Sequence, residues 1–499
     1  MNQSQEDNML RCLTLTAERD EQKRENIRRY SGFIDCVEIR LDLCESKTPE
    51  TVRSLIAAAD CPVVLSCRRK RDTAAGAPDP GAEILPDNPA DEKQRLAILA
   101  EVLQPGISFV DLEADADSPD LLRKAEALNV RIIRSVHDFQ GVPSDLAGLV
   151  KNLAAQGAIP KIACFPRSSG EALDLYRSCR KVEDVREKIV LGMGPFGFFT
   201  RVAPWLCGSM LTFISAGDRK GAPGHIGPRE LEEVYGLSGH GCETRIFGII
   251  GNPVMHTLSP RLHNPWFSSG GMNAVYVPFQ VDDLAQFFRM AEEIGVLGFS
   301  VTVPHKQGII DMVDEISDDV RDIGACNTVV RREKGWFGSN TDLAGFLDPL
   351  EDVLEAERID RALVIGAGGA ARTVVYALKR RGLEITVVNR SPERARALAE
   401  SAGTGWFASK TLPSLMEFEL VVQTTSAGME PDIEADPLPD FIFQGTEIVY
   451  DIIYAPEKTR FLQRAEAAGC RIIGGSRMLR AQAELQFEQF RNSYNLWAE

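Results

Sequence analysis

The sequence predicts an α/β protein whose N-terminal half is a (β/α)8 barrel and whose second half consists of two α/β domains. Three observations predict this fold class. Short apolar runs alternate with helical segments from residue 10 to about residue 235. A short, small and polar segment, 237–244, then precedes a new apolar run. In the second half, a glycine-rich turn joins an apolar run to a helical pattern, as in a Rossmann-like domain.

The composition is that of an ordinary soluble globular protein. The chain has 499 residues, of which 44% are hydrophobic and 26% charged, which is enough for two or three domains. The formal net charge of −16 argues against nucleic acid and anionic membranes as partners. An anionic substrate must therefore be bound by local arginines and lysines.

Targeting and redox features favour a cytoplasmic protein. The first ten residues are polar and acidic, so we expect no signal peptide, and no apolar run reaches membrane-spanning length. The eleven cysteines form no CxxC pair, which is typical of reduced thiols rather than a disulfide scaffold. The six histidines lack close metal-ligand spacing, so we expect no metal.

The predicted barrel spans residues 1–236. Its eight expected strands are 12–16, 36–42, 62–67, 107–113, 131–137, 161–165, 189–194 and 211–215. Eight strands alternating with helices over this length match a (β/α)8 barrel. Such barrels carry their active sites at the carboxyl ends of the strands. At those ends, or in the loops that follow, the sequence has Glu38, Arg40, Arg68, His137, Lys161 and Arg201.

Two of these residues suggest a reaction. Lys161 begins an apolar strand, and a lysine desolvated there should have a lowered pKa and a free amine able to attack a ketone. His137, at the end of the neighbouring strand, could transfer a proton beside it. The residues alone leave two interpretations equally open. One is a lyase or aldolase that works through a Schiff base, and the other is a lysine whose ammonium reaches solvent at a strand end.

After the linker 237–244, residues 245–345 form a first α/β unit, which we expect residues 476–499 to complete. Its short polar segments carry the residues that suit a polyhydroxylated ligand and a proton-coupled hydride transfer. Each segment alone is ordinary loop chemistry. The residues are Thr257, Ser259, Thr302, Lys306, Asn327 and Asp342.

Residues 346–475 form the predicted dinucleotide-binding domain. The turn Gly366, Ala367, Gly368, Gly369, Ala370 lies between the expected strand 362–365 and a helix, where glycines let backbone amides approach a pyrophosphate. The next strand, 385–388, ends at Asn389 and Arg390 instead of an acidic residue, and Arg394 follows. Cationic donors suit a 2′-phosphate, so we predict NADP rather than NAD. The alternative is that both arginines simply lie on a solvated helix face.

The first half resembles type I 3-dehydroquinate dehydratase over essentially its whole length. The matching segments, in the order of that family, are 38–42, 66–68, 109–113, 135–139, 161–163, 193–194 and 222–224. The resemblance implies that Lys161 forms an imine with the substrate ketone and that His137 moves the proton. It implies that Arg201 holds the carboxylate, that Glu38, Arg40 and Arg68 order hydroxyls and charge, and that Asp72 lies near the histidine. Gly221 and His225 stand where the family usually has serine and glutamine, so we expect an altered closing loop.

Residues 245–499 are similar to shikimate dehydrogenase. The resemblance rests on Ser259, Lys306, Asn327, Asp342, the glycine-rich turn, Asn389-Arg390, and the segments 424–429, 451–456 and 474–482. It implies that Lys306 and Asp342 are the acid–base pair. It implies substrate binding by Thr257, Ser259, Thr302, Asn327, Tyr454 and Gln482, and a nicotinamide site at Thr425 and Gly475. Thr257, Ser300 and Gln423 depart from the usual residues of the family, and none of them removes a predicted catalytic group.

Together the halves resemble a fused enzyme that performs two consecutive steps. The first step would dehydrate 3-dehydroquinate to 3-dehydroshikimate, and the second would reduce that product to shikimate with NADPH. Two alternatives remain at this point. One is a quinate/shikimate dehydrogenase working in the oxidative direction, and the other is a metabolite-sensing regulator without catalysis. The sequence leaves the oligomeric state open, and it favours a plain fusion joint over a channel between the sites.

Overall fold

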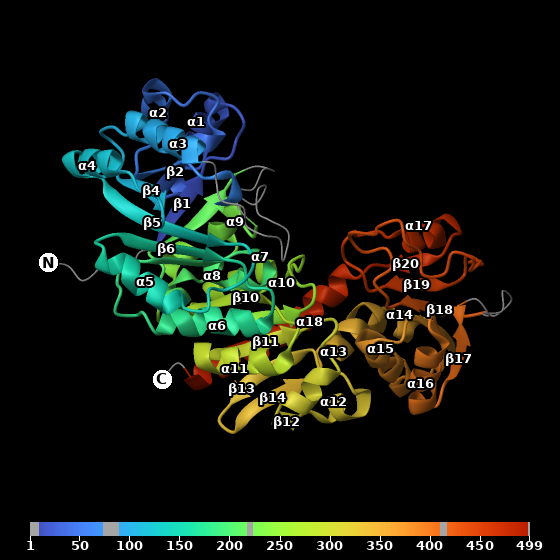
Figure 1. Cartoon of the computed structure of the whole chain (residues 1–499). Coiled ribbons are helices and arrows are strands. Elements are labelled where there is room, and N and C mark those ends of the chain that lie inside the picture. Colours follow the sequence, from blue (N-terminus) through green and yellow to red (C-terminus); the bar gives the residue numbers. More distant parts are fainter. Residues whose placement is uncertain (1–8, 73–88, 217–222, 410–416, 498–499) are drawn as a thin grey trace. The chain divides into compact units, whose positions relative to one another are not determined.

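The computed structural model describes residues 9–72, 89–216, 223–409 and 417–497 (Figure 1). The chain forms two compact units. The first unit comprises residues 1–248 and 253–296, and the second comprises residues 249–252 and 297–499. The division falls within strand β9 (Arg245–Gly251).

Eight parallel strands form the predicted barrel in the first unit (Figure 1). They are β1 (Leu10–Thr14), β2 (Cys36–Arg40), β3 (Val63–Ser66), β4 (Phe109–Glu113), β5 (Arg131–Asp138), β6 (Ile159–Cys164), β7 (Ile189–Gly192) and β8 (Leu211–Ser215). Their order is β7-β6-β5-β4-β3-β2-β1-β8, and every neighbouring pair in this order is parallel. The prediction of eight strands and an α/β barrel is confirmed. Individual strand ends differ from those predicted by up to two residues, and β6 starts before Pro160 because Ile159 packs in the barrel core.

The helices of the barrel region are α1 to α9. They are α1 (Asp20–Arg29), α2 (Pro49–Ile56), α3 (Pro89–Val102), α4 (Pro119–Ala127), α5 (Leu146–Ala155), α6 (Ser169–Arg180), α7 (Gly194–Gly197), α8 (Phe199–Val202) and α9 (Pro228–Glu233). The first unit also contains α10 (Ser259–Ser269), β10 (Ala274–Gln280) and α11 (Leu284–Ile294).

The interior of the barrel changes from apolar to charged along the strands. Side chains two residues apart on a strand point to the same face. One inner layer is therefore apolar, with Phe109, Ile133 and Ile159 in one buried cluster. Two residues further along those strands lie the polar side chains of Asp111, Ser135 and Lys161. The apolar layer closes the base of the barrel, and the charges gather toward its carboxyl end.

The second unit contains two sheets. Strands β11 (Val296–Val301), β13 (Thr328–Arg332), β14 (Gly335–Ser339) and β12 (Glu315–Ile316) lie in that order, with antiparallel pairs β11–β13 and β13–β14. The helices of this unit are α12 (Asp318–Ile323), α13 (Asp342–Leu347), α14 (Glu351–Ala356), α15 (Gly369–Arg380), α16 (Pro392–Ala402), α17 (Arg460–Ala467) and α18 (Ser476–Trp497).

The other sheet of the second unit is parallel and has the predicted Rossmann-like topology. Its strands are β15 (Arg361–Ile365), β16 (Glu384–Asn389), β17 (Gly405–Ala408), β18 (Leu420–Gln423), β19 (Ile448–Asp451) and β20 (Arg471–Ile473). The order β17-β16-β15-β18-β19-β20 reverses direction between β15 and β18. Residues alternate between two buried clusters, with Val364 in one and Leu363 in the other, as a sheet covered on both faces requires. Dinucleotides bind at such a reversal point.

Candidate active sites

Lys161 lies in the charged layer of the barrel with only 3% of its surface exposed. Its Nζ donates a hydrogen bond to Asp111 Oδ2 at 2.8 Å and lies 3.8 Å from the centre of the Phe213 ring. Burial lowers the pKa of Lys161, and the charge of Arg68 lowers it further, while Asp111 acts in the opposite direction. The unprotonated amine is therefore favoured more than in an ordinary lysine, in the direction that the sequence analysis predicted.

A buried network holds the groups around this amine. Glu38 accepts hydrogen bonds from Thr14 Oγ1 at 2.8 Å and from Ser66 Oγ at 3.0 Å. The Arg68 guanidinium bonds both oxygens of Asp111, and its Nη1 donates to Ser135 Oγ at 2.7 Å. Arg68 Nη2 also lies 3.5 Å from Glu38 Oε1. These contacts fix the carboxylates relative to the lysine.

His137 lies two residue pairs closer to the carboxyl end of the barrel than Lys161. Ser135 pairs with Lys161 across β5 and β6, and His137 pairs with Ala163. Burial of its ring lowers the pKa of His137 well below the usual value, and the charges of Arg68 and Lys161 add to this effect. The imidazole is therefore neutral around pH 7 and able to accept a proton. Its buried Nδ1 has no hydrogen-bond partner in the part of the chain that the structure describes.

Arg201, on α8, is a fully buried cation. Its Nη1 and Nη2 donate to the backbone oxygens of Phe213 at 3.4 Å and Pro223 at 3.2 Å. Its Nε has no hydrogen-bond partner, and no carboxylate pairs with Arg201 among the described residues. Burial alone lowers its pKa to about 10. A buried guanidinium in these surroundings is suited to binding an anion.

The remaining predicted residues of the first half have varied positions. Arg40 shares the inward face of β2 with Glu38, but its guanidinium is bonded to Asp42 at 3.0 and 2.6 Å. Asp72 is half-buried, and burial raises its pKa to about 6. His225 is buried in the loop after β8. Gly221, the predicted change in the closing loop, lies outside the described residues.

Sequence reasoning missed Asp111 as a member of this site. It is the direct partner of Lys161 and of Arg68, and these two cations hold its pKa well below the usual range. The signal was the alternation along β4, because Asp111 follows Phe109 by two residues and must share its inward face. The same rule would have identified Ser66 and Ser135.

In the second unit, Lys306 and Asp342 form an ion pair. Lys306 Nζ donates to Asp342 Oδ2 at 2.5 Å, and Asn327 Nδ2 donates to Asp342 Oδ1 at 2.8 Å. Asn327 Nδ2 also lies 3.0 Å from Thr341 Oγ1 and 3.4 Å from Gln482 Oε1. Four of the predicted residues, Lys306, Asn327, Asp342 and Gln482, are therefore brought together by the fold.

Residues that the sequence analysis did not assign to the site hold this cluster in place. Gln486 Nε2, from α18, donates to the Asn327 backbone oxygen at 3.2 Å and to Thr328 Oγ1 at 3.0 Å. Ser300 Oγ donates to Gln486 Oε1 at 2.8 Å. The long C-terminal helix thereby supports the amide that contacts Asp342.

The glycine-rich turn approaches the same lysine. A Cβ on Gly369 would lie 3.1 Å from Lys306 Cβ, so a side chain there would crowd the lysine. Gly366 has φ +124°, and a Cβ there would lie 2.3 Å from Thr424 Oγ1. A Cβ on Gly368, by contrast, would meet open space. The turn therefore has the close backbone approach at Gly366 and the free space at Gly368 that a pyrophosphate needs at the N-terminus of α15.

The end of β16 fits a 2′-phosphate. Asn389 Nδ2 donates to the Ser391 backbone oxygen at 3.1 Å, and Arg390 and Arg394 are both exposed. Within the described ranges, neither arginine makes an ion pair, so both guanidinium groups are available to a phosphate. Gln423, the last residue of β18, fixes the loop that follows that strand, since its side chain bonds the backbone of Thr425 and Ala427.

The other predicted residues of the second half are less closely connected. In the first unit, Thr257 Oγ1 and Ser259 Oγ lie 3.1 Å apart at the N-terminus of α10. In the second unit, Thr302 and Tyr454 are half-buried. Gly475 packs so tightly that a Cβ would lie 2.2 Å from the Ile452 backbone oxygen.

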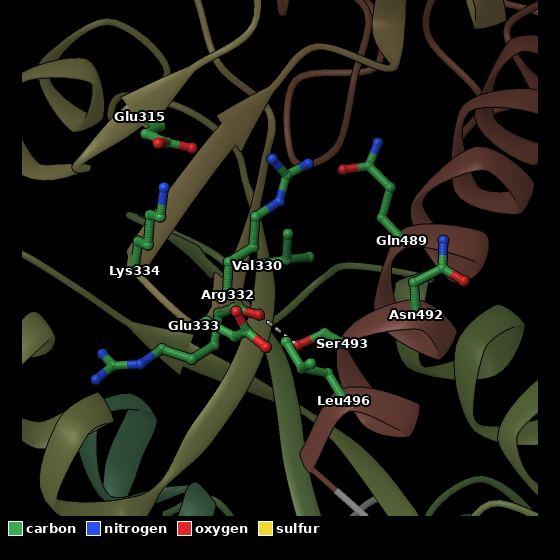
Figure 2. A pocket seen from close by; sticks show the side chains of 10 residues that line it. Glu315, Val330, Arg332, Glu333, Lys334, Gln489, Asn492, Ser493 and Leu496 are labelled. Atoms are coloured by element: carbon green, nitrogen blue, oxygen red, sulfur yellow. Dashed lines mark hydrogen bonds between the residues drawn. The ribbon is translucent and has the colours of Figure 1, made fainter.

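A hollow of about 430 Å³ lies elsewhere in the second unit (Figure 2). Its lining comes from β12, β13, the following turn and the C-terminal part of α18. It contains Glu315, Val330, Arg331, Arg332, Glu333, Lys334, Gln489, Asn492, Ser493 and Leu496. None of the predicted site residues lines it, so it is separate from the Lys306 cluster.

Two features are missing from the described residues. No group of three or more His, Cys, Asp and Glu side chains is placed to hold a metal ion. None of the helices in the described ranges combines the length and the apolar character needed to cross a membrane.

Family models match both halves of the chain. The model of type I 3-dehydroquinase matches residues 11–242. The shikimate dehydrogenase substrate binding domain matches residues 249–329, and the shikimate/quinate 5-dehydrogenase model matches residues 351–441. Fold and site therefore define a lyase joined to an NADP-dependent oxidoreductase.

Two relatives and one solved structure are similar to the chain. A bifunctional 3-dehydroquinate dehydratase/shikimate dehydrogenase, chloroplastic, from Arabidopsis thaliana is 31% identical over 91% of this chain and 77% of its own length. An NADP(+) shikimate dehydrogenase from Moorella thermoacetica is 40% identical over 49% of this chain and 88% of its own. A Thermus thermophilus shikimate 5-dehydrogenase structure with NADP(H) and shikimate has a TM-score of 0.44 at 34% identity, covering 50% of this chain and 99% of that one. The chain belongs to the family of bifunctional 3-dehydroquinate dehydratase/shikimate dehydrogenases.

Proposed function

We propose that the first half dehydrates 3-dehydroquinate through an imine on Lys161. The observation that carries this proposal is the buried amine beside Asp111, with a neutral histidine two residue pairs further along the neighbouring strand. Lys161 would attack the ketone and expel water, so that the imine acidifies the adjacent C–H bond. His137 would remove that proton and return it to the departing hydroxyl, which leaves as water. Hydrolysis of the imine would then release 3-dehydroshikimate and the free lysine.

The surrounding charges have separate roles in this proposal. Arg201 would bind the substrate carboxylate, because it is a buried cation without a carboxylate partner among the described residues. Glu38, Arg40 and Arg68 would order the hydroxyls and the charge around Lys161, with Asp111 orienting the amine. His225 would contribute to the closing loop, and Asp72 would act near His137.

Borohydride trapping tests the imine. The protein is incubated with 3-dehydroquinate, reduced with borohydride, and digested, and the modified peptide is located by mass. The proposal requires the label on the peptide that contains Lys161. Protein that dehydrates the compound but carries its label elsewhere, or carries none, would contradict the proposal.

We propose that Lys306 and Asp342 are the acid–base pair of the second half. NADPH, when bound, supplies the hydride. Lys306 would donate a proton to the developing alkoxide, and Asp342 would accept a hydrogen bond from the same hydroxyl. Asn327, Thr302, Gln482 and Tyr454 would bind the substrate hydroxyls. Thr257 and Ser259 would bind its carboxylate, because both hydroxyls lie at the N-terminus of α10.

The cofactor-binding residues are also a proposal. The backbone of Gly366, Ala367, Gly368, Gly369 and Ala370 would approach the pyrophosphate, supported by the φ of Gly366 and the space beside Gly368. Asn389, Arg390 and Arg394 would bind the adenosine ribose and its 2′-phosphate. Thr425 and Gly475 would lie against the nicotinamide. Retained acid–base groups argue against a non-catalytic sensor, and the exposed arginines favour the NADP enzyme over a quinate dehydrogenase.

We further propose the organisation of the chain and its cellular context. The domains are 1–236, the linker 237–244, 245–345 completed by 476–499, and 346–475. The partners are the small molecules 3-dehydroquinate, 3-dehydroshikimate and shikimate, with no nucleic acid, since the chain carries a net charge of −16. All eleven cysteines are free, which supports a reducing compartment such as the cytoplasm. Cell fractionation and a nucleic-acid binding assay would test these two points.

A further inference from the structure

A segment of the second half packs against the barrel within one compact unit. Residues 253–296 follow the barrel in the chain and belong to the shikimate dehydrogenase match, yet they lie in the first unit. Ser169 N donates to Asp282 Oδ1 at 2.8 Å, and Asp282 N donates to Ser169 Oγ at 3.1 Å. This reciprocal pair lies at the start of α6, eight residues after Lys161 in the chain. The contact therefore reaches the carboxyl side of the barrel, where the charged layer gathers.

Helix α11 extends this interface along α6. Tyr176 Oη donates to the Glu293 backbone oxygen at 3.0 Å. The Arg177 guanidinium also bonds the Glu293 carboxylate, with Nε 3.0 Å from Oε1 and 3.1 Å from Oε2. The exposed ion pair between Arg177 and Glu293 contributes little to stability alone. The buried end of the same interface is aromatic.

The aromatic end lies against the helix that carries Arg201. The Phe199 ring, at the start of α8, lies 6.0 Å from the ring of Phe279 on β10. Phe279 in turn lies 5.6 Å from Phe287 on α11. Phe199, Phe279 and Phe287 are at most 2% exposed, so removal of the middle ring would leave a cavity behind α8.

Arg201 depends on the backbone of α8 for its position. Its guanidinium makes only two bonds of 3.2 and 3.4 Å, both to backbone oxygens, and no carboxylate holds it among the described residues. On the barrel side, Thr212 Oγ1 donates to the Arg201 backbone oxygen at 3.0 Å. On the other side, α8 packs against Phe279. A shift of this four-residue helix would therefore move the guanidinium directly.

We propose that Phe279, a residue of the dehydrogenase half, is a positioning residue of the dehydratase. It fixes α8 through Phe199 and thereby sets where Arg201 binds the substrate carboxylate, an assignment that rests on the proposed function of Arg201. The dehydratase of this chain then extends beyond the barrel and includes β10 and α11. A fusion whose halves were only tethered would show no such dependence.

The test measures dehydratase kinetics of the full chain with Phe279→Leu and Phe279→Ala. Loss of positioning weakens binding of the substrate carboxylate in ground state and transition state alike, so KM should rise roughly tenfold for Phe279→Ala and less for Phe279→Leu. We expect kcat to stay within about twofold, since Lys161 and His137 are untouched. Borohydride trapping at saturating substrate should still label Lys161.

Two parallel variants separate the possible outcomes. Phe267→Leu is the matched control, because that ring is equally buried in the same segment but packs on Phe247 and His263. It should leave the dehydratase KM unchanged. Arg201→Lys should raise KM at least as much as Phe279→Ala. If Arg201→Lys leaves KM unchanged, the proposed role of Arg201 fails.

If Arg201→Lys raises KM but folded Phe279→Leu and Phe279→Ala do not, only the positioning role of Phe279 is overturned. The same conclusion follows if Phe267→Leu raises KM equally, because the effect would then be general destabilisation. Should Phe279→Ala fail to fold, the milder Phe279→Leu decides the question. Folding of each variant is monitored by thermal unfolding.

Discussion

The surroundings of Lys161 and of Lys306 differ in how far water and other charges reach the amine. The Lys161 side chain is 4% exposed and lies within a network of two carboxylates and an arginine. The Lys306 side chain is 17% exposed and makes one close ion pair, with Asp342. Burial lowers the pKa of Lys161, which favours the neutral amine. A nucleophile must lose its proton before it attacks, whereas a proton donor must keep it until the reaction.

In the proposed function, the same kind of side chain performs two different tasks in one chain. A covalent nucleophile needs a dry, compensated position on a rigid strand, and β6 provides it. A proton donor needs contact with a carboxylate and an amine that is not fully enclosed. The loop after β11 gives Lys306 its contact with Asp342 and leaves its side chain 17% exposed.

Replacement of the Lys161 amine should abolish the first activity and spare the second. Lys161→Met keeps most of the apolar stem but removes the nucleophile, so we expect the dehydration rate to fall about 10⁴-fold or more. Reduction of 3-dehydroshikimate with NADPH should stay within about twofold of the unchanged protein. The matched control is Lys188→Met, which removes another buried lysine of the barrel that bonds the Val185 backbone oxygen. Loss of both activities from Lys161→Met would indicate collapse of the fold instead.

Replacement of Lys306 should have the converse effect. Lys306→Met removes the proposed proton donor beside Asp342, and we expect kcat for reduction to fall about 10³-fold. Because the NADP domain is intact, binding of NADPH should be retained, as fluorescence titration can measure. Dehydration of 3-dehydroquinate should be unaffected. A variant that still reduces 3-dehydroshikimate at the normal rate would remove Lys306 from the mechanism.

Much of the architecture could be predicted because it depends on local pattern. The apolar runs of the barrel strands and the Gly366 turn each determine their structure within a few residues, so the strand number and the Rossmann-like unit were predicted correctly. Lys161 stood out because a lysine is rare among the buried apolar neighbours of a strand. The lowering of its pKa could be predicted from burial, whereas the contribution of Arg68 could not.

Non-local pairing could not be predicted in the same way. The alternation along β4 puts Asp111 inside the barrel, but the choice of Lys161 as its partner depends on side chains from several strands. The bond between Gln486 and Thr328 joins residues 158 positions apart. The contact between Phe199 and Phe279 depends on how a segment beyond the linker packs on the barrel. Such contacts are set by tertiary packing, which periodicity does not encode.

The pH dependence of an Asp111 variant tests how this carboxylate affects Lys161. Its carboxylate raises the pKa of Lys161, while burial and Arg68 lower it. Asp111→Asn should therefore lower the pKa of the lysine further. The free amine then persists to lower pH, and the acidic limb of the imine-formation rate should move to lower pH. We expect dehydration at pH 7 to fall about 10²-fold, because the amine loses its orienting hydrogen bond.

The control for this prediction is Asp42→Asn. Asp42 bonds the Arg40 side chain and the Arg68 backbone in the same barrel, and within the described part of the chain it makes no hydrogen bond or ion pair with Lys161. The acidic limb of this variant should coincide with that of the unchanged protein. Stopped-flow measurement of imine formation between pH 5 and 9 resolves both variants. A limb that moves to higher pH in Asp111→Asn would contradict the assigned sign of the Asp111 effect.

The smallest effect is expected at the end of β16. Arg390→Ala removes one exposed cation that has no ion-pair partner within the described ranges, so the fold should be unaffected. A charge-assisted hydrogen bond to a phosphate contributes about 1.5–3 kcal/mol, so KM for NADPH should rise by roughly tenfold or more. NADH has no 2′-phosphate, so its KM should change little. The preference for NADPH over NADH should therefore become smaller. Arg396→Ala is the matched control, because Arg396 lies on α16, the helix that follows Arg390, but pairs with Glu400 at 2.7 Å. An equal rise in KM for NADPH and for NADH in Arg390→Ala would mean that Arg390 does not bind the 2′-phosphate.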